Sequence, residues 1–153
     1  MKSEPRVILL VEDEEAHAEI IRRNLEDCDF TSHLVHVEDG QFALDYLYQR
    51  NGFRPPAEVR RPDIILLDWN LPKLSGLEVL KTIKTDPLLK RIPVIILTTS
   101  SAEADISAAY EYHANSFLMK PMDYANFHQM LETLCAYWFA WNHYPIESEG
   151  SIS

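Results

Sequence analysis

The sequence predicts an α/β fold of the doubly wound class, in which helices cover both faces of a five-stranded parallel sheet. Three observations lead to this prediction. Short apolar segments alternate strictly with longer segments of helical periodicity. Two of the short segments, residues 64–67 (IILL) and 92–97 (IPVIIL), are almost continuously apolar, as strands buried on both faces are. The chain has 153 residues, 46% of them hydrophobic, which is enough for one core of that size.

Local patterns predict the first half of the alternation. A strand is expected at residues 6–11 (RVILLV), followed by a helix at residues 14–25, where small or apolar side chains recur at helical spacing. Residues 33–37 (HLVHV) alternate polar and apolar side chains, which predicts a second strand. Asp39 is expected to cap the second helix. Residues 51–61 (NGFRPPAEVRR) hold a glycine, two prolines and three arginines, and so predict an unusually long loop.

The second half continues in the same way. After the strand at residues 64–67, we expect a helix at about 76–84, a strand at 92–97, a helix at about 103–112, a strand at 115–119 and a last helix from about residue 123. No repeat or linker interrupts this order. We therefore predict one domain over residues 1–144, with an extended C-terminal helix, and a disordered tail over residues 145–153.

Composition excludes several classes of protein. A formal net charge of -10 argues against nucleic-acid binding, because a phosphate backbone requires a basic face. The apolar run near the N-terminus is too short for a signal peptide or a membrane span, so we expect a cytoplasmic protein that does not bind membranes. Cys28 and Cys135 lack the spacing of metal ligands, and without an export signal we expect both thiols to be reduced.

Polar side chains stand at the carboxyl ends of four predicted strands. They are Glu12, Asp13, Asp68, Thr98 and Lys120. In open parallel sheets this edge is where ligands bind. Three carboxylates placed together would repel one another unless a cation sat among them, and oxygen ligands of this kind suit Mg²⁺. The ammonium and the hydroxyl suit a phosphoryl group.

Four motifs carry a resemblance to a known family. They are VEDEE at 11–15, LDWNLPKLSGLEVL at 67–80, VIILTTS at 94–100 and LMKPM at 118–122. Together they resemble the receiver domain of two-component response regulators over residues 6 to about 140. The resemblance implies a flavodoxin-like (βα)5 receiver fold. It also implies a signalling protein rather than an enzyme, with only slow self-phosphorylation and self-dephosphorylation.

The resemblance assigns a role to each residue at the strand ends. Asp68 would accept a phosphoryl group from a phosphohistidine of a sensor histidine kinase. Thr98 and Lys120 would bind the phosphoryl oxygens, and a cis Lys120–Pro121 bond would aim the lysine at the pocket. Mg²⁺ would be held by four groups: Glu12, Asp13, Asp68 and the backbone carbonyl of Asn70.

Four other positions carry expectations. Phe117 stands where the family couples an aromatic side chain to the threonine, so a switch role is implied, and an ordinary core aromatic is the alternative. His113 stands where many receivers have glycine and is expected at positive φ. Trp69 is expected to pack on the surface or as a lid. His17 and the remaining histidines share no spacing that suggests catalysis or zinc binding.

The last helix is unusually aromatic. Spacing places Phe127, Leu131, Leu134, Trp138 and Trp141 on one face that could cover the sheet. The apolar surplus predicts a homodimer through five residues: Tyr137, Trp138, Phe139, Trp141 and Tyr144. A larger intramolecular core is the alternative.

A narrower resemblance points to the small single-domain regulators of cyanobacterial phytochromes, because the chain combines a long loop with an aromatic C-terminal helix. The kinase would then be a phytochrome, contacted by arginines of that loop unless they are merely solvated; they are Arg50, Arg54, Arg60 and Arg61. Asn70 argues against a phosphatase of the haloacid dehalogenase type, which needs an aspartate there. Glu12 and Asp13 argue against a flavin binder. A phosphorylation-independent dimeric scaffold or adaptor remains the rival.

Overall fold

The structure, a computed structural model, describes residues 6–28, 32–50 and 61–145. Its five strands form one parallel sheet in the order β2-β1-β3-β4-β5. The strands are β1 (Arg6–Val11), β2 (Ser32–Val37), β3 (Ile64–Leu67), β4 (Val94–Thr98) and β5 (Ser116–Met119). The helices are α1 (Glu15–Glu26), α2 (Gly40–Leu47), α3 (Gly76–Thr85), α4 (Glu103–Glu111) and α5 (Tyr124–Cys135). The predicted doubly wound, flavodoxin-like fold is confirmed.

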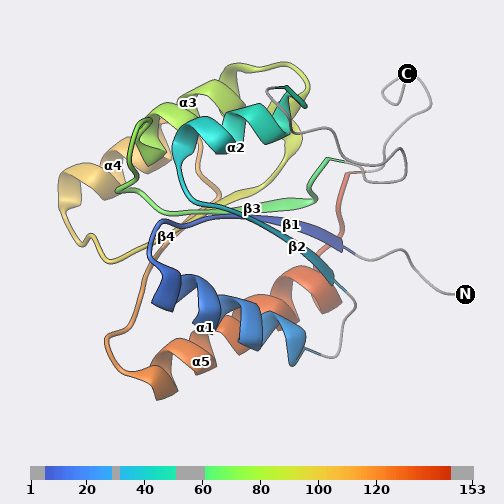
Figure 1. Ribbon diagram of the computed structural model, residues 1–153, viewed down its shortest axis with the longest axis vertical. Helices are drawn as coiled ribbons and strands as arrows, with labels where there is room; N and C mark the ends of the chain where they lie inside the picture. The colour runs from blue at the N-terminus through green and yellow to red at the C-terminus, as the bar shows by residue number, and fades with distance from the viewer. Residues whose placement is uncertain (1–5, 29–31, 51–60, 146–153) are drawn as a thin grey trace, which may run out of the picture.

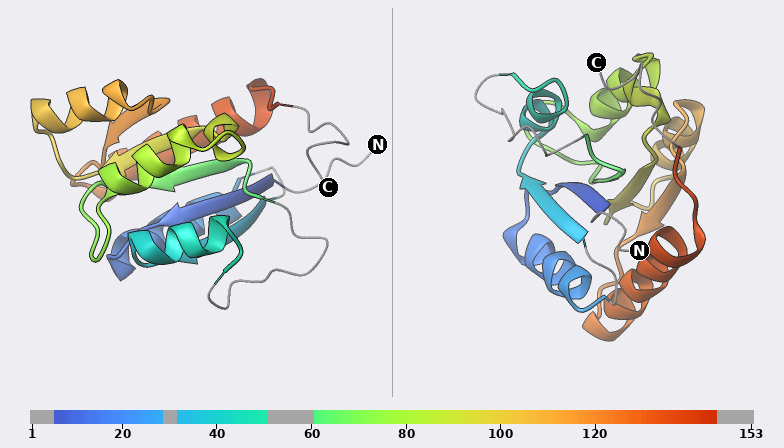
Figure 2. Two further views of the ribbon diagram at one scale, coloured as in Figure 1. Left: turned by 90° about the horizontal axis from the view of Figure 1, so that it is seen from above. Right: turned by 90° about the vertical axis from the view of Figure 1, so that its right-hand side faces the viewer.

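Two helical layers cover the sheet, with α2, α3 and α4 on one face and α1 and α5 on the other (Figure 1). A second view of the molecule, in Figure 2, again shows α1 and α5 side by side. Alternate residues of each strand face opposite layers, so β1 sends Leu9 and Val11 into one core and Ile8 and Leu10 into the other. The continuously apolar strands are therefore buried on both faces.

Local capping signals end and start the helices as the sequence indicates. The Asp39 side chain accepts a hydrogen bond of 2.8 Å from the N–H of Phe42 at the start of α2, which confirms the predicted cap. His113 has a φ of 71°, also as predicted. The N–H of His113 donates to Tyr110, and that of Ala114 donates to Ala109, so the left-handed residue closes α4 in a Schellman motif.

The C-terminal helix continues beyond α5, but its geometry changes. A π-helix, η2 (Ala136–Trp141), follows directly and ends where the N–H of Asn142 donates to the carbonyl of Tyr137. Each π-helical residue turns less about the axis than an α-helical residue, so α-helical spacing no longer defines one face. Trp141 is consequently 77% exposed, and the prediction that it covers the sheet is wrong.

The expectation of two reduced thiols is also wrong. Cys28 and Cys135 form a disulfide, with Cα atoms 6.8 Å apart, although the two residues are 107 positions apart in sequence. Since α1 and α5 pack side by side on one face of the sheet, their C-terminal ends bring the two sulfur atoms together. Sequence spacing alone carries no information about such a contact.

One further helix completes the described part, the short 3₁₀ helix η1 (Leu89–Arg91). Within residues 6–28, 32–50 and 61–145, no helix has the length and apolar character needed to cross a bilayer. The predicted loop lies outside the described residues except for Arg61, and so does the predicted tail except for Pro145. Arg50 pairs with Asp45 of its own chain at 3.0 Å.

Candidate functional site

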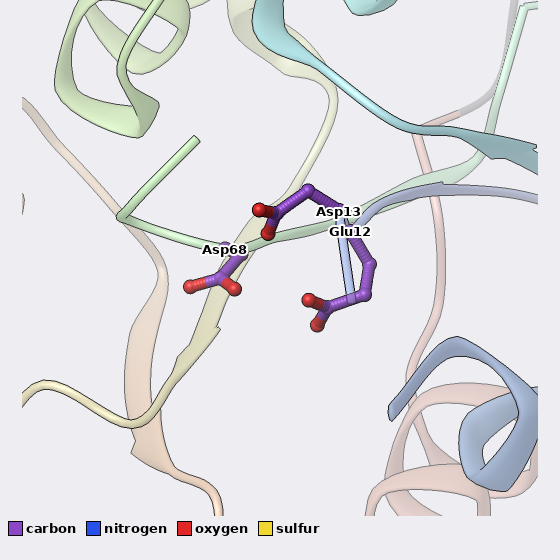
Figure 3. Close-up of side chains that lie close together, drawn as sticks. All are labelled: Glu12, Asp13 and Asp68. Carbon is purple, nitrogen blue, oxygen red and sulfur yellow. The ribbon is translucent and has the colours of Figure 1, made fainter. Parts of the chain in front are cut away.

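The acidic residues predicted from the strand ends do meet at one edge of the sheet. Glu12 and Asp13 follow β1, and Asp68 follows the adjacent strand β3. Each offers a carboxylate oxygen, and these oxygens all lie within 4.8 Å of one another. Figure 3 shows the three side chains together, with those of Glu12 and Asp13 just after the end of β1 and that of Asp68 just after the end of β3.

Asp68 is held on both sides of its carboxylate. Oδ1 lies 2.7 Å from the backbone nitrogen of Trp69 and 3.4 Å from that of Asn70, and both N–H groups donate to it. Oδ2 lies 3.2 Å from Nζ of Lys120. The residue is only 7% exposed, so its orientation is fixed by the strand behind it and by these donors.

A glycine allows α3 to begin against this carboxylate. The N–H of Gly76 donates to the carbonyl of Trp69 at 2.9 Å. A Cβ on Gly76 would lie 2.4 Å from the backbone oxygen of Asp68, which is a forbidden approach to rigid backbone. Any larger residue would therefore push the acceptor loop out of place.

Lys120 reaches into the site from the end of β5. Its Nζ lies 2.5 Å from Oε1 of Glu12, 3.2 Å from Oδ2 of Asp68 and 3.0 Å from Nδ1 of His17. The predicted cis bond is wrong, because no cis peptide occurs in the described ranges. The lysine is aimed instead by β-type pairing, since its N–H donates to the carbonyl of Thr98 at 2.8 Å.

Glu12 is a buried carboxylate whose ionisation depends on its partners. Burial raises the pKa of Glu12 to about 7, while the hydrogen bond and charge of Lys120 act in the opposite direction. Its Oε2 also accepts from the N–H of Glu14 at 3.1 Å. A cation nearby would favour the charged form of Glu12, as the sequence argument requires.

The donor set fits a divalent cation. Three carboxylates face one ammonium in this cluster, so the ionised groups leave an excess of negative charge. Asp13 is exposed and its oxygen is close to the other two, whereas one Glu12 oxygen is engaged by Lys120. Hard oxygen ligands with open access are what Mg²⁺ and similar ions require. The site can thus hold a divalent cation through Asp13 and Asp68, with Glu12 behind them.

Two histidines that the sequence did not predict as site residues also lie at this edge. His17, in the first turn of α1, approaches Lys120. Nε2 of His36, on β2, lies 2.8 Å from the backbone oxygen of Glu12 and donates to it, because a carbonyl only accepts. The register pairs His36 with Leu10, two residues before Glu12, so strand pairing could have suggested His36. No sequence signal identifies His17.

Thr98 and Phe117 lie on the adjacent strands β4 and β5. Thr98 ends β4 with no exposed surface, and Phe117 is half-buried on the adjacent strand β5. The Phe117 ring packs edge-on against Trp69, with ring centroids 6.2 Å apart. Trp69 is a core residue, 7% exposed, so its predicted place on the surface or as a lid is wrong. It directly follows Asp68 and links that residue to Phe117.

The five predicted interface residues divide into two groups. Tyr137 and Trp141 are exposed. Trp138, Phe139 and Tyr144 instead pack against the core beneath α1 and α5. The Arg6 guanidinium lies 4.2 Å from the centre of the Tyr144 ring, at the amino end of β1, on the opposite edge of the sheet from the acids.

The fold and this edge of the sheet agree with a family match. Residues 8–132 match the model of the response regulator receiver domain. The chain therefore belongs to the response regulator receiver domains and is a signalling protein of two-component systems.

Particular relatives make the match more specific. The chain is 42% identical to the probable methanogenesis regulatory protein FilR2 of Methanothrix harundinacea, over 93% of this chain and 89% of that one. It is 40% identical to the response regulator Rcp1 of Synechocystis, over 88% and 89%. A crystal structure of Mn²⁺-bound Rcp1 superposes with a TM-score of 0.87, covering 93% of this chain and all of the other at 39% identity. The phosphorylated cyanobacterial phytochrome response regulator RcpA gives the same TM-score, covering 94% and 100% at 38% identity.

Proposed function

We propose that the chain takes a phosphoryl group onto Asp68 from the phosphohistidine of a sensor histidine kinase, with Mg²⁺ as the cation. One observation supports this most strongly: the Asp68 carboxylate is fixed between backbone N–H groups and Lys120, beside two further carboxylates. Asp13 and Asp68, with Glu12 and the backbone carbonyl of Asn70, would hold the ion.

The chemistry needs alignment and charge neutralisation. A carboxylate oxygen of Asp68 attacks phosphorus, the bond from phosphorus to the imidazole nitrogen breaks, and an acyl phosphate forms while histidine leaves. The bound cation offsets the negative charge of the phosphoryl oxygens. Lys120 donates to those oxygens from within the site, and the hydroxyl of Thr98 supplies a further donor. Asp68 is held in one orientation in advance, which lowers the cost of alignment with the phosphoryl group.

The conformational signal would pass along two adjacent strands. A phosphoryl oxygen that draws the Thr98 hydroxyl towards Asp68 leaves space beside β5, and Phe117 can turn into it. The Phe117 ring would then change its contact with Trp69. The movement of Phe117 would alter the surface formed by α4, β5 and α5, which a downstream protein can recognise.

A phytochrome is the kinase that the relatives favour. Rcp1 and RcpA resemble this chain over nearly its whole length, and RcpA is described as a phytochrome response regulator. FilR2, in contrast, is named as a probable methanogenesis regulatory protein. Phosphorylation that depends on red and far-red light would therefore distinguish a phytochrome from another kinase. The protein would act in the cytoplasm as a single receiver domain.

A homodimer through the C-terminal region is part of the proposal. Tyr137 and Trp141 project from η2, and large exposed aromatic side chains anchor interfaces. Tyr137 also borders a cavity of about 750 Å³ between β5 and α5, together with Trp138 and Met130. A second copy would bury these aromatic groups, whereas Trp138, Phe139 and Tyr144 contribute mainly by holding the segment in place.

Labelling with a small phosphodonor tests the central proposal. Incubation with radiolabelled acetyl phosphate should label the wild type only when Mg²⁺ is present. Asp68→Asn should abolish the label, and Asp86→Asn, a half-buried control at the C-terminal end of α3, should retain it. An unlabelled wild type, or a label that survives in Asp68→Asn, would instead favour a phosphorylation-independent scaffold.

A further inference from the structure

His17 lies against the lysine of the phosphoryl site, although it is neither an acid nor a strand-end residue. Its Nδ1 is 3.0 Å from Nζ of Lys120, 103 positions away in sequence. The imidazole ring also lies near the buried Phe127 ring of α5, with centroids 6.2 Å apart, which helps to fix its orientation. The side chain is 24% exposed, so water can exchange protons with it.

The same nitrogen faces a second group with the opposite requirement. Oε2 of Glu14 lies 3.2 Å from Nδ1. An ammonium only donates hydrogen bonds and an ionised carboxylate only accepts them. Nδ1 can accept from Lys120 only when it carries no proton, and it can donate to Glu14 only when it carries one. The hydrogen bond from Lys120 and a donation from Nδ1 to Glu14 therefore exclude each other.

Lys120 cannot keep all its present partners when a phosphoryl group arrives. Its three N–H donors point to Glu12, Asp68 and His17, and this uses the full capacity of an ammonium. Phosphorylation turns the Asp68 carboxylate into an acyl phosphate, so one phosphoryl oxygen takes the donor that faced Asp68. A second phosphoryl oxygen needs one of the other two donors. The bond to Glu12 is short and joins opposite charges, whereas the bond to a neutral imidazole lacks the second charge. The His17 bond is the one that Lys120 gives up at least cost.

We propose that His17 is a positioning residue for Lys120 that works as a hydrogen-bond exchange switch. Before phosphorylation, unprotonated Nδ1 holds the ammonium beside Asp68. After phosphorylation, Lys120 turns to the phosphoryl oxygens, the ring proton moves from Nε2 to Nδ1 through water, and Nδ1 donates to Glu14. No proton is gained or lost overall. The inference rests on the proposed function of Asp68, since it concerns what the phosphoryl group displaces.

Nitrogen NMR of the wild-type protein reads this exchange directly. Protein labelled with ¹⁵N in histidine should show an unprotonated Nδ1 for His17 in Mg²⁺ buffer. In the presence of excess acetyl phosphate it should show a protonated Nδ1 and an unprotonated Nε2. His33, which is exposed on β2, serves as the internal reference and should not change. A His17 signal that stays the same in fully phosphorylated protein would overturn the proposal.

Two substitutions separate positioning from a structural role. His17→Leu removes the acceptor that holds the ammonium beside Asp68 before the reaction, and we expect phosphorylation by acetyl phosphate to slow by about fivefold because Lys120 is no longer positioned in advance. His17→Asn places an amide near the position of Nδ1 and should restore most of the rate. His33→Leu should have no effect. Thermal unfolding of each variant shows whether it is folded, and the NMR test on the wild type does not depend on these variants.

The outcomes distinguish the proposed role of His17 from the proposed phosphorylation of Asp68. If wild-type protein is labelled, the label is lost in Asp68→Asn, and His17→Leu reacts at the wild-type rate, only the role of His17 is overturned. A slow His17→Leu that His17→Asn does not rescue would also overturn it, because loss of packing would then explain the rate. Failure to label the wild type at all would overturn both proposals.

Discussion

The sequence predicted a functional role for two regions: the acidic edge of the sheet and the C-terminal segment, residues 135–144. The structure agrees with the prediction more fully in the first region than in the second. At the edge, the three predicted acids and Lys120 lie beside one another, because the ends of parallel strands meet wherever the sheet forms. In the C-terminal segment, similar aromatic side chains divide between core and solvent. Strand ends are placed by topology, whereas a helix face depends on details of helix geometry.

The two regions also differ in what stabilises them. The acidic edge buries charge, and Glu12, Asp68 and Lys120 are each less than a tenth exposed. The C-terminal segment is held by apolar packing, by the Arg6–Tyr144 contact and by the disulfide at its beginning. Substitutions can therefore test each region by a different kind of interaction.

The largest effect should come from the disulfide that ties the C-terminal segment to α1. The two cysteines are 107 positions apart, and opening so long a loop should lower the free energy of unfolding by about 4–5 kcal/mol. Denaturant unfolding with and without reductant measures this difference. The double variant Cys28→Ser/Cys135→Ser is the control and should not respond to reductant. Two titratable thiols in native, unreduced protein would contradict the structure.

The next effect belongs to the acidic edge. Lys120→Met leaves Glu12 and Asp68 without their shared cation, and we expect a loss of about 3 kcal/mol of unfolding free energy in chelator, as for broken buried ion pairs. Mg²⁺ should stabilise this variant more than the wild type, because it replaces part of the missing charge. Thermal unfolding with and without Mg²⁺ measures both quantities.

Lys73→Met provides the matched control, because Lys73 pairs with Asp39 at 3.7 Å from an exposed position. Its stability should change by no more than about 1 kcal/mol, since exposed pairs contribute little. Equal losses in the two lysine variants would mean that burial does not distinguish the acidic edge from the rest of the surface.

The smallest expected effects on unfolding free energy concern the two tryptophans of the C-terminal segment, which should differ from each other. Trp138→Ala should lower the unfolding free energy by about 2 kcal/mol, because the ring is partly buried against the core. Trp141→Ala should change it by less than about 0.5 kcal/mol in the monomer and should weaken the proposed dimer. Unfolding at low protein concentration and sedimentation velocity at high concentration separate the two effects. A dimer that survives Trp141→Ala would remove this residue from the interface.

Most of the fold could be predicted because its signals are local. Strand and helix periodicity, the Asp39 cap and the positive φ of His113 each depend on a few neighbouring residues, and each is present in the structure. The acids of the site followed from strand ends for the same reason. Trp69 was misjudged because period-2 alternation stops where β3 ends at Leu67, so it could not place a residue of the following turn.

The amino-acid sequence by itself determined the order of the elements, the parallel sheet and the meeting of Glu12, Asp13, Asp68, Thr98 and Lys120 at one edge, since topology follows from alternation. Tertiary structure alone decided three contacts. They are His17 with Lys120, Cys28 with Cys135, and Arg6 with Tyr144. Each joins residues more than a hundred positions apart. Such pairs form only when α1, α5 and the sheet pack together, and no local pattern encodes the distance between their side chains.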